Sequence, residues 1–424
     1  MKGKIASLVQ FNWATLPLNP QVVETIHAAR AAGRRVVLAT ASHRLLADPL
    51  ANYLGLFDEV VATEGTLNLS GSRKADRLVG MFGVRGFDYA GNSRDDLPIW
   101  AFSRAAIVVS AQGSLRREAG AVTRVDVVIT PDRPSPKDYA KALRLHQWLK
   151  NMLLFVPLLA AHRLLDVGAL GSAALAFIAF SLCASAVYLL NDLLDLESDR
   201  EHIRKRNRPF ASAKIPLWTG LAMIPALLLL SGIACIALPP AFTVILVAYF
   251  AITLSYSFWL KKQVVVDVLM LAALYTVRVV AGGAATGISP SFWLLLFSMF
   301  IFLSLALVKR YSEMYVVLKQ NKSQAAGRGY SIDDLPVLMS VGTSSGMVAV
   351  LVFSLYINNA ETLSIYGSPQ RLWPISGLLL YWVTRLWMKT HRGEIDDDPV
   401  VFALKDWQSI AVLALAAFCF VFAA

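Results

Sequence analysis

The chain has 424 residues, of which 56% are hydrophobic and 16% are charged, and its formal net charge is +11. Soluble domains carry about 25% charged residues, so this composition excludes a wholly soluble or disordered protein. The three cysteines lie inside apolar runs, which excludes a disulfide scaffold. An excess of Lys and Arg is typical of the cytoplasmic side of membrane proteins, and we expect no nucleic-acid partner.

The first 136 residues differ in composition from the rest. They contain 16 Lys/Arg and 12 Asp/Glu, with neither an apolar run of membrane length nor an apolar leader segment. Short strands are predicted at 36–39, 59–62, 87–90 and 106–109. Helices are predicted at 20–33, 43–54, 74–82 and 94–102. This alternation predicts an α/β domain over 1–136, and a proline-rich linker at 130–136 leads to a second domain over 137–424.

The second domain is predicted to be an all-α, multi-pass bundle in the lipid bilayer, because a spanning helix needs about 20 mostly apolar residues. Nine spans are predicted: 148–162, 168–190, 217–237, 241–259, 264–286, 291–308, 335–357, 373–390 and 407–423. The loops on one side hold 17 Lys/Arg; these loops are 200–216, 260–264, 309–334 and 385–406. The opposite loops hold only Arg163 and Arg371. The split predicts that the basic loops and the N-terminal domain face the cytoplasm.

An acidic run, Asn191-Asp192-Leu193-Leu194-Asp195-Leu196-Glu197-Ser198-Asp199, follows the second predicted span. Asp192, Asp195 and Asp199 stand at i, i+3 and i+7, which places them on one face of a continuous helix. Like charges repel unless a cation lies between them, and Mg²⁺ prefers carboxylates together with substrate phosphates. The alternative, a hydrated helix end, is disfavoured because acids there oppose the helix dipole. The run therefore predicts an Mg²⁺ site.

Basic residues accompany this run. The loop after it contains Arg200, Arg204, Lys205, Arg206 and Arg208. Such a loop suits a phosphate-rich substrate, although it also fits simple membrane topology. Farther along, Asp267 begins a predicted span, and Arg278 stands three turns deeper on the same predicted side. An arginine inside the membrane indicates either a functional site or a structural pair.

These residues resemble the UbiA prenyltransferase superfamily. The match is the Asn-Asp-x-x-Asp-x-x-x-Asp run at 191–199, continuing into Arg-Asn-Arg-Pro at 206–209. Over about 140–424 the chain is similar to the decaprenyl-phosphate phosphoribosyltransferase branch. The matches to this branch are Gln147-Trp148-Leu149-Lys150-Asn151, Tyr256-Ser257-Phe258-Trp259-Leu260-Lys261, Arg278 with Ala281-Gly282, Lys309-Arg310 with Glu313, and His391-Arg392-Gly393 with Asp398-Pro399.

The resemblance implies an Mg²⁺-dependent transfer of 5-phosphoribose from phosphoribosyl diphosphate to a polyprenyl phosphate, at the bacterial inner membrane. It assigns metal binding and catalysis to Asp192, Asp195 and Asp199, and catalysis also to Asp267. Substrate binding is implied for Lys150, Asn151, Asn191, Arg206, Arg208, Tyr256, Lys261, Arg278, Lys309, Arg310 and Arg392. The chain departs from many superfamily members, which bind a second metal at a second Asp-x-x-x-Asp motif, because Leu271 stands four residues after Asp267.

The N-terminal domain resembles the haloacid dehalogenase-like phosphatases. The matches are Leu38-Ala39-Thr40-Ala41-Ser42 after a strand, Lys74 at a helix start, and Tyr89-Ala90-Gly91-Asn92-Ser93-Arg94-Asp95-Asp96 after a later strand. The family's nucleophilic Asp-x-Asp has no counterpart in residues 10–16, and Asn92 replaces a metal-binding Asp, although Asp96 remains. The resemblance therefore implies a degenerate phosphatase, in which Thr40 and Lys74 either hold a phosphate or have a structural role.

Two other functions fit the same sequence. A conventional prenyltransferase would move a prenyl group from its diphosphate to a small acceptor, and a non-catalytic membrane protein would only bind polyprenyl phosphate. A transporter fits less well, because the acids gather at one side of the predicted bundle and not at the bilayer midplane.

Overall fold

The computed structural model describes residues 3, 6–8, 12–65, 68–202, 204–320, 329–359, 368–395 and 398–423. The chain forms two compact units. The N-terminal unit comprises Met1–Ala142 and Asp192–Gly220, and the helical unit comprises Leu143–Asn191 and Leu221–Ala424. The predicted domain boundary near residue 136 stays a prediction.

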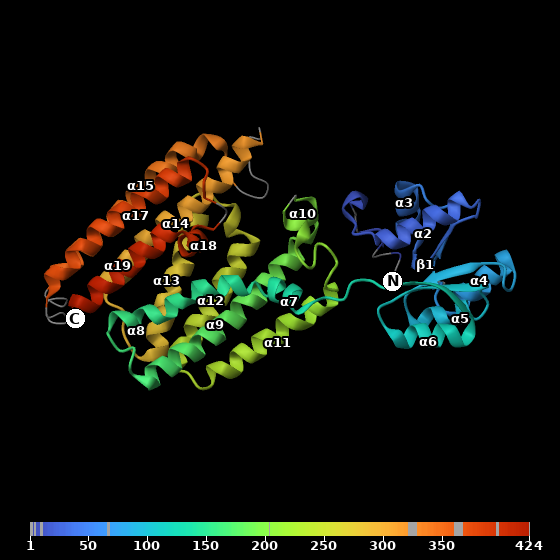
Figure 1. The fold of residues 1–424 in the computed structure, drawn as a ribbon, viewed down its shortest axis with the longest axis horizontal. Coiled ribbons are helices and arrows are strands. Elements are labelled where there is room, and N and C mark those ends of the chain that lie inside the picture. The colour runs from blue at the N-terminus through green and yellow to red at the C-terminus, as the bar shows by residue number, and fades with distance from the viewer. Residues whose placement is uncertain are drawn as a thin grey trace. The chain divides into compact units, whose positions relative to one another are not determined.

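The N-terminal unit contains a group of parallel strands (Figure 1). They are β1 (Val37–His43), β2 (Glu59–Thr63), β3 (Asp88–Gly91), β4 (Ala105–Val109) and β5 (Arg124–Ile129). β1 pairs with β2, and β4 lies between β3 and β5 in a second sheet; every pairing is parallel. Parallel strands require crossover connections, which are supplied mainly by helices. These helices are α3 (Arg44–Leu54), α5 (Leu97–Trp100) and α6 (Gly113–Val122). Two further helices are α2 (Pro20–Ala31), which precedes β1, and α4 (Ser72–Phe82), which joins the two sheets.

Local chemistry sets the ends of the N-terminal helices. Asn19 caps α2 by accepting hydrogen bonds from the backbone N–H groups of Gln21 and Val22, and Pro20 occupies the first helical position. Gly55 ends α3 with a φ of 61°, a left-handed conformation that favours glycine. The predicted strands and helices of this region are all present. The structure adds α6 and β5, which the sequence analysis did not predict.

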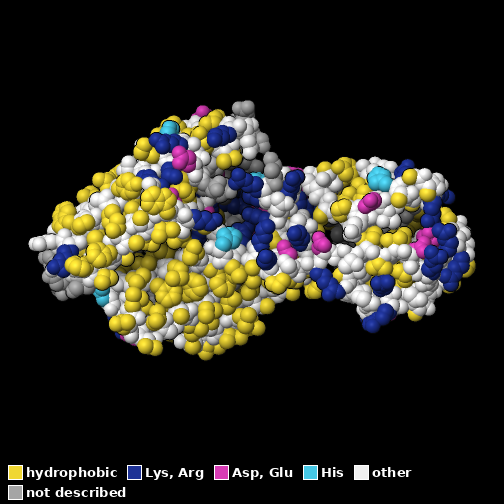
Figure 2. Space-filling model, in the orientation of Figure 1, with side chains coloured by type: hydrophobic (Ala, Val, Ile, Leu, Met, Phe, Trp, Pro, Cys, Tyr) yellow, Lys and Arg dark blue, Asp and Glu magenta, His cyan; other side chains and the backbone are white. Residues whose placement is uncertain are grey.

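The helical unit consists mainly of long helices (Figure 1). Its elements are η3 (Leu145–Phe155), α8 (Val156–Ala160), α9 (Val167–Leu194), α11 (Leu217–Cys235), α12 (Pro240–Phe258), α13 (Val266–Thr286), α14 (Phe292–Lys319), α15 (Leu335–Ile357), α17 (Trp373–His391), α18 (Pro399–Lys405) and α19 (Trp407–Ala423). The last residues of α9 and the first residues of α11 belong to the N-terminal unit. Figure 2 shows hydrophobic side chains over most of the visible face of this helical unit.

Among the described residues, six helices are long and apolar enough to cross a membrane. A seventh span is formed if α18 and α19, which are bent by 80° at their junction, are counted together. The chain is therefore an integral membrane protein with a mostly helical membrane part and an α/β domain, as predicted.

Nine spans were predicted, whereas the length and hydrophobicity of the described helices give six or seven. The segment 148–162 does not form one long helix, because an 11-residue 3₁₀ helix, η3, is followed by the five-residue helix α8. The segment 373–390 does form α17, but Thr384, Arg385 and Lys389 interrupt its apolar sequence.

Glycine allows two close approaches inside the helical unit. A Cβ atom added at Gly282 of α13 would lie 2.0 Å from the carbonyl oxygen of Leu154 in η3. One added at Gly342 of α15 would lie 2.1 Å from the Trp387 ring of α17. Close backbone contact through small residues is how helices pack tightly in lipid, where the hydrophobic effect does not drive their association. The first contact positions η3 against α13, and the second positions α15 against α17.

Candidate functional site

The acidic run lies where α9 ends. The continuous helix predicted for it is wrong, because α9 stops at Leu194 and α10 covers Leu196–Glu201. Asp195 stands between them, at the N-cap position of α10, and its side chain makes no capping hydrogen bond. Asp192 is thus in the last turn of α9 and Asp199 is inside α10. Both are buried, whereas Asp195 at the break is half-buried.

Arg208 joins two of the three carboxylates. Its Nη1 lies 3.1 Å from Asp192 Oδ1 and 2.5 Å from Asp199 Oδ2. Burial raises the pKa of Asp199, and the Arg208 guanidinium opposes that shift. The helix break therefore does not separate Asp192 from Asp199, because both carboxylates face one cation.

This arrangement fits a magnesium ion held by few protein ligands. Within the described ranges, no three His, Cys, Asp or Glu side chains are clustered closely enough to hold a metal alone. Mg²⁺ is ordinarily bound by one or two carboxylates together with waters and substrate phosphates. Asp192 and Asp199, converging on one positive group, supply that number. Arg206, two residues before Arg208, is exposed and carries a further positive charge.

A second polar cluster lies in the helical unit around Lys150 of η3. The Lys150 ammonium binds the carboxylate of Asp398, which caps α18, and lies 5.6 Å from the centre of the Tyr275 ring. Burial alone would raise the pKa of Asp398, but Lys150 outweighs it and holds the pKa below its usual range. Lys309 of α14 is half-buried and contributes a further positive charge near Asp398. The cluster provides two lysines for an anionic group.

A third cluster surrounds Arg278 of α13, which is only 4% exposed. Its Nε donates to Asn151 Oδ1 at 2.8 Å, and its Nη2 donates to the Tyr249 hydroxyl at 3.1 Å. The guanidinium also lies within 5.7 Å of the ring centres of Phe180, Tyr249 and Tyr275. In the described part of the chain, no carboxylate pairs with Arg278. The arginine connects η3 to α12 and α13.

Asp267 and Arg278 have different surroundings, although both were predicted on one side of α13. Asp267 is paired with Arg310 of α14 and Tyr330, not with the residues that contact Arg278. Arg310, predicted to bind substrate, is fully buried in this pairing. Of the other predicted substrate-binding residues, Asn191, Tyr256 and Lys261 are half-buried and Arg392 is exposed.

Four polar residues of these clusters were missed as site residues by the sequence analysis. Asp398 was noted only as part of an Asp-Pro pair, and Tyr249, Tyr275 and Tyr330 stand in sequences without a distinctive motif. Only Asp398 carried a usable signal, because an acid just before the proline of a short helix is a good N-terminal cap.

The N-terminal domain uses its phosphatase-like residues internally. Lys74 Nζ donates to the Tyr89 hydroxyl at 2.9 Å, and this hydroxyl donates to Asp96 Oδ1 at 3.1 Å. Asp96 Oδ2 accepts from the backbone N–H groups of Asn92 and Ser93. Burial, and then the charge of Asp96, raise the pKa of Tyr89. The nucleophile of the family would stand within residues 10–16. Residues 10 and 11 lie outside the described residues.

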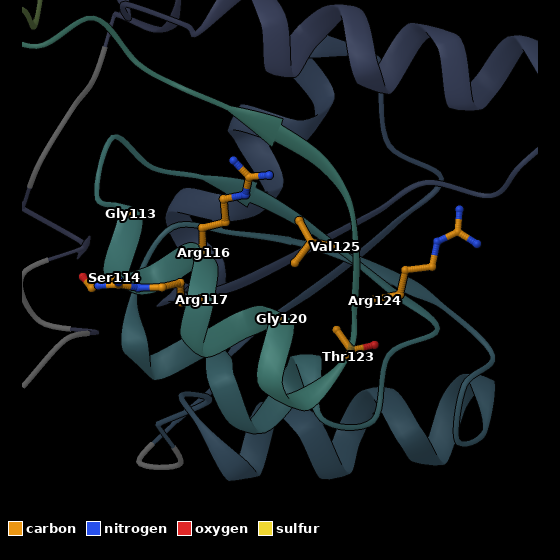
Figure 3. Close-up of a pocket in the computed structure, with 8 residues that line it drawn as sticks. All are labelled: Gly113, Ser114, Arg116, Arg117, Gly120, Thr123, Arg124 and Val125. Atoms are coloured by element: carbon orange, nitrogen blue, oxygen red, sulfur yellow. The ribbon is translucent and has the colours of Figure 1, made fainter.

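Figure 3 shows an open cavity of 740 Å³ in the same domain, lined by α6 and the start of β5. Arg116 and Arg117 come from α6, and Arg124 begins β5. Arg124 is paired with Asp126 at 2.6 Å. None of the residues predicted to act in either domain lines this cavity.

Long apolar helices, with charged clusters formed by residues in and next to them, define an integral membrane protein. The chain belongs to the UbiA prenyltransferase family, whose model matches residues 152–410. A model of haloacid dehalogenase-like hydrolases matches residues 5–100. Both resemblances predicted from the sequence are thereby confirmed.

Relatives and solved structures agree with this assignment. An uncharacterised protein of Sinorhizobium fredii is 37% identical over 429 residues, covering 100% of this chain and 82% of that protein. A decaprenyl-phosphate phosphoribosyltransferase of Mycobacterium tuberculosis is 33% identical over 295 residues, covering 69% of this chain and 95% of that protein. A UbiA homologue from Archaeoglobus fulgidus, bound to DMAPP and Mg²⁺, has a TM-score of 0.53 at 16% identity, covering 66% of this chain and 98% of that one. The last similarity shows the fold.

Proposed function

We propose that this UbiA-family transferase moves 5-phosphoribose from phosphoribosyl diphosphate to a polyprenyl phosphate and releases diphosphate. The relative from Mycobacterium tuberculosis that is named for this activity supports the choice of donor and acceptor. The observation that carries the chemistry is the convergence of Asp192 and Asp199 on Arg208. Such a group of opposite charges suits a diphosphate bound through a cation.

Asp192 and Asp199 would hold Mg²⁺, and Asp195 stays a predicted ligand. When bound, the ion neutralises charge on the leaving diphosphate. Arg206 and Arg208 would contact the same leaving group as charged donors, and Lys261 stays a predicted substrate-binding residue.

The cluster around Lys150 is proposed to bind a phosphate group. Lys150 and Lys309 offer two ammonium groups, and Asp398 fixes the first of them. Asn151, which follows Lys150 on η3, is held by hydrogen bonds to Ser181 and Arg278. Asn191, Tyr256 and Arg392 stay predicted substrate-binding residues, and Asp267 stays a predicted catalytic residue.

The acceptor needs little activation. A phosphate monoester is already anionic at neutral pH, so transfer to it requires no general base, and the work of the site is positioning and charge stabilisation. The apolar tail of a polyprenyl phosphate is soluble in the bilayer that surrounds the helices. The proposed transfer takes place at the bacterial inner membrane, with the N-terminal domain in the cytoplasm. The distribution of Lys and Arg among the loops supports this orientation.

The test is mass spectrometry of lipids after membranes containing the protein are incubated with labelled phosphoribosyl diphosphate, Mg²⁺ and polyprenyl phosphates of several lengths. We expect a phosphoribosylated lipid and one diphosphate per product. A conventional prenyltransferase would instead consume a prenyl diphosphate, and a binding protein would release diphosphate from neither donor. Absence of labelled lipid and diphosphate with every acceptor would refute the proposal.

A further inference from the structure

Asp267 of α13 and Arg310 of α14 form an ion pair in the interior of the helical unit. Arg310 Nη2 lies 2.6 Å from Asp267 Oδ2, and neither side chain has any exposed surface. The Tyr330 hydroxyl donates to Asp267 Oδ1 at 2.8 Å. Oδ1 therefore accepts a hydrogen bond, whereas Oδ2 faces Arg310 Nη2 in an ion pair whose geometry makes no hydrogen bond.

The neighbouring residues complete a closed cluster. Arg310 Nη1 binds the carboxylate of Glu313 one turn along α14, and the guanidinium lies 5.7 Å from the centre of the Tyr330 ring. The Tyr330 hydroxyl also accepts from the backbone N–H of Val265 at 2.8 Å. A buried carboxylate requires a compensating positive charge, and here Arg310 provides it.

The backbone around Tyr330 covers this cluster tightly. A Cβ atom at Gly329 would lie 2.6 Å from the carbonyl oxygen of Lys262, so only glycine permits this approach. Tyr330 itself is 2% exposed. Mg²⁺ demands several oxygen ligands in octahedral geometry and usually keeps bound waters. Leu271, one turn after Asp267, offers no oxygen from its side chain, and the packing around Tyr330 leaves Asp267 no contact with solvent.

We infer that Arg310, and not a metal ion, is the counter-ion of Asp267. The second metal site that many UbiA-superfamily members have is replaced in this chain by an internal ion pair. The inference rests on the proposed function only in assigning the metal of the reaction to Asp192 and its neighbours. This assignment replaces the catalytic role predicted for Asp267. Asp267 and Arg310 are then positioning residues that fix α13 against α14, and their charge pair does not depend on the magnesium concentration.

The first experiment measures Mn²⁺ binding to the full-length protein in nanodiscs by electron paramagnetic resonance, with inorganic diphosphate present. Wild-type protein should show isolated Mn²⁺ and no spin-coupled pair. The double variant D267N/R310Q should bind Mn²⁺ within about twofold of wild type, whereas D192N should bind at least about tenfold more weakly. A coupled Mn²⁺ pair that disappears in D267N, or tenfold weaker binding in the double variant, would overturn the inference.

The second experiment measures melting temperatures of wild type, D267N, R310Q and the double variant. R310Q leaves the buried Asp267 carboxylate without a counter-charge, whereas the double variant removes that carboxylate as well, so R310Q should lower the melting temperature more than the double change. D267N leaves Arg310 paired with Glu313 and should have a smaller effect than R310Q. Additive losses would contradict the ion pair. Failure of the proposed function gives a different result: D192N would then bind Mn²⁺ like wild type, while the coupling between Asp267 and Arg310 would persist.

Discussion

At the residue scale, Arg208 serves two carboxylates whose charges would otherwise repel each other. Replacing Asp192 by Asn leaves Arg208 paired with Asp199, so the protein should stay folded. The rate of diphosphate release should nonetheless fall by about 10² or more, comparable to the loss of one electrostatic contact to a transition state. The control is Asp166→Asn, an equivalent change at a carboxylate that pairs with Arg163 and caps α9. Equal activity of the two variants would remove Asp192 from the site.

Lys150 and Asp398 offer a separate test of positioning. Without the Asp398 carboxylate, the Lys150 ammonium loses its fixed orientation, and Asp398→Asn should raise the KM for the phosphorylated donor about tenfold with a smaller effect on kcat. Lys150→Met should have the larger effect, and the double variant should be no worse than Lys150→Met alone, because the two residues act together. Independent, multiplicative effects in steady-state kinetics would contradict this pairing.

The same pair predicts a flat pH dependence near neutrality. The pKa of Asp398 in the folded protein lies below the ordinary value for Asp. The carboxylate is therefore charged at any pH above that ordinary pKa, and its contribution is lost only as the pH falls through the lowered pKa. The ratio of KM for Asp398→Asn to that for wild type should therefore stay constant between about pH 6 and pH 8. A ratio that approaches one within this range would show that Asp398 is neutral there.

At the element scale, η3 is unusual, because 3₁₀ helices rarely exceed four residues. Its side chains are fixed by hydrogen bonds from Trp148 to Ser185 and from Asn151 to Ser181. Its backbone rests directly on Gly282. These polar and steric contacts to two helices hold the segment that carries Lys150 and Asn151, and they explain why an apolar sequence forms no ordinary spanning helix here.

Gly282→Ala tests this contact. The added methyl group would overlap the carbonyl of Leu154, so the melting temperature should fall, by an amount equivalent to about 1–3 kcal/mol of overpacking. Gly232→Ala in α11 is the matched control, because nothing lies within 4 Å of its Cβ position. It should be neutral or slightly stabilising, since alanine favours helices by about 1 kcal/mol over glycine. Similar melting temperatures for both variants would argue against close packing at Gly282.

The elements differ in how well the sequence predicted them. Long apolar runs identified α9 and α11–α15, because burial in lipid needs only length and hydrophobicity. The segment at 148–162 passed the same test, yet its structure is decided by Ser181, Ser185 and Gly282, which no local pattern reveals. Likewise Lys150 and Asp398 are 248 residues apart. Their pairing could not be derived without the fold, whereas the acidic run at 191–199 was visible as a local motif.

At the scale of the whole molecule, the N-terminal domain has kept a phosphatase-like fold while its polar groups bind one another. Because Lys74 is held by Tyr89 and Asp96, and Asn92 stands where a metal ligand is usual, we expect no hydrolysis of p-nitrophenyl phosphate or sugar phosphates by the full-length protein with Mg²⁺. The comparison is with the Lys74→Ala variant, which should give the same background rate. Turnover that disappears in this variant would identify a working phosphatase site.

The orientation of the membrane part can be tested at two exposed positions in short loops. Residues 321–328 and 360–367, in two loops on opposite predicted sides, lie outside the described residues, so we choose Gln263 and Ser289. With basic loops in the cytoplasm, Gln263→Cys should resist a membrane-impermeant thiol reagent in intact cells and react after permeabilisation. Ser289→Cys should react without permeabilisation. Wild-type protein controls for the native cysteines, of which Cys183 and Cys235 are buried. The reverse labelling pattern would place the acidic run away from a cytoplasmic donor and would refute the proposed orientation.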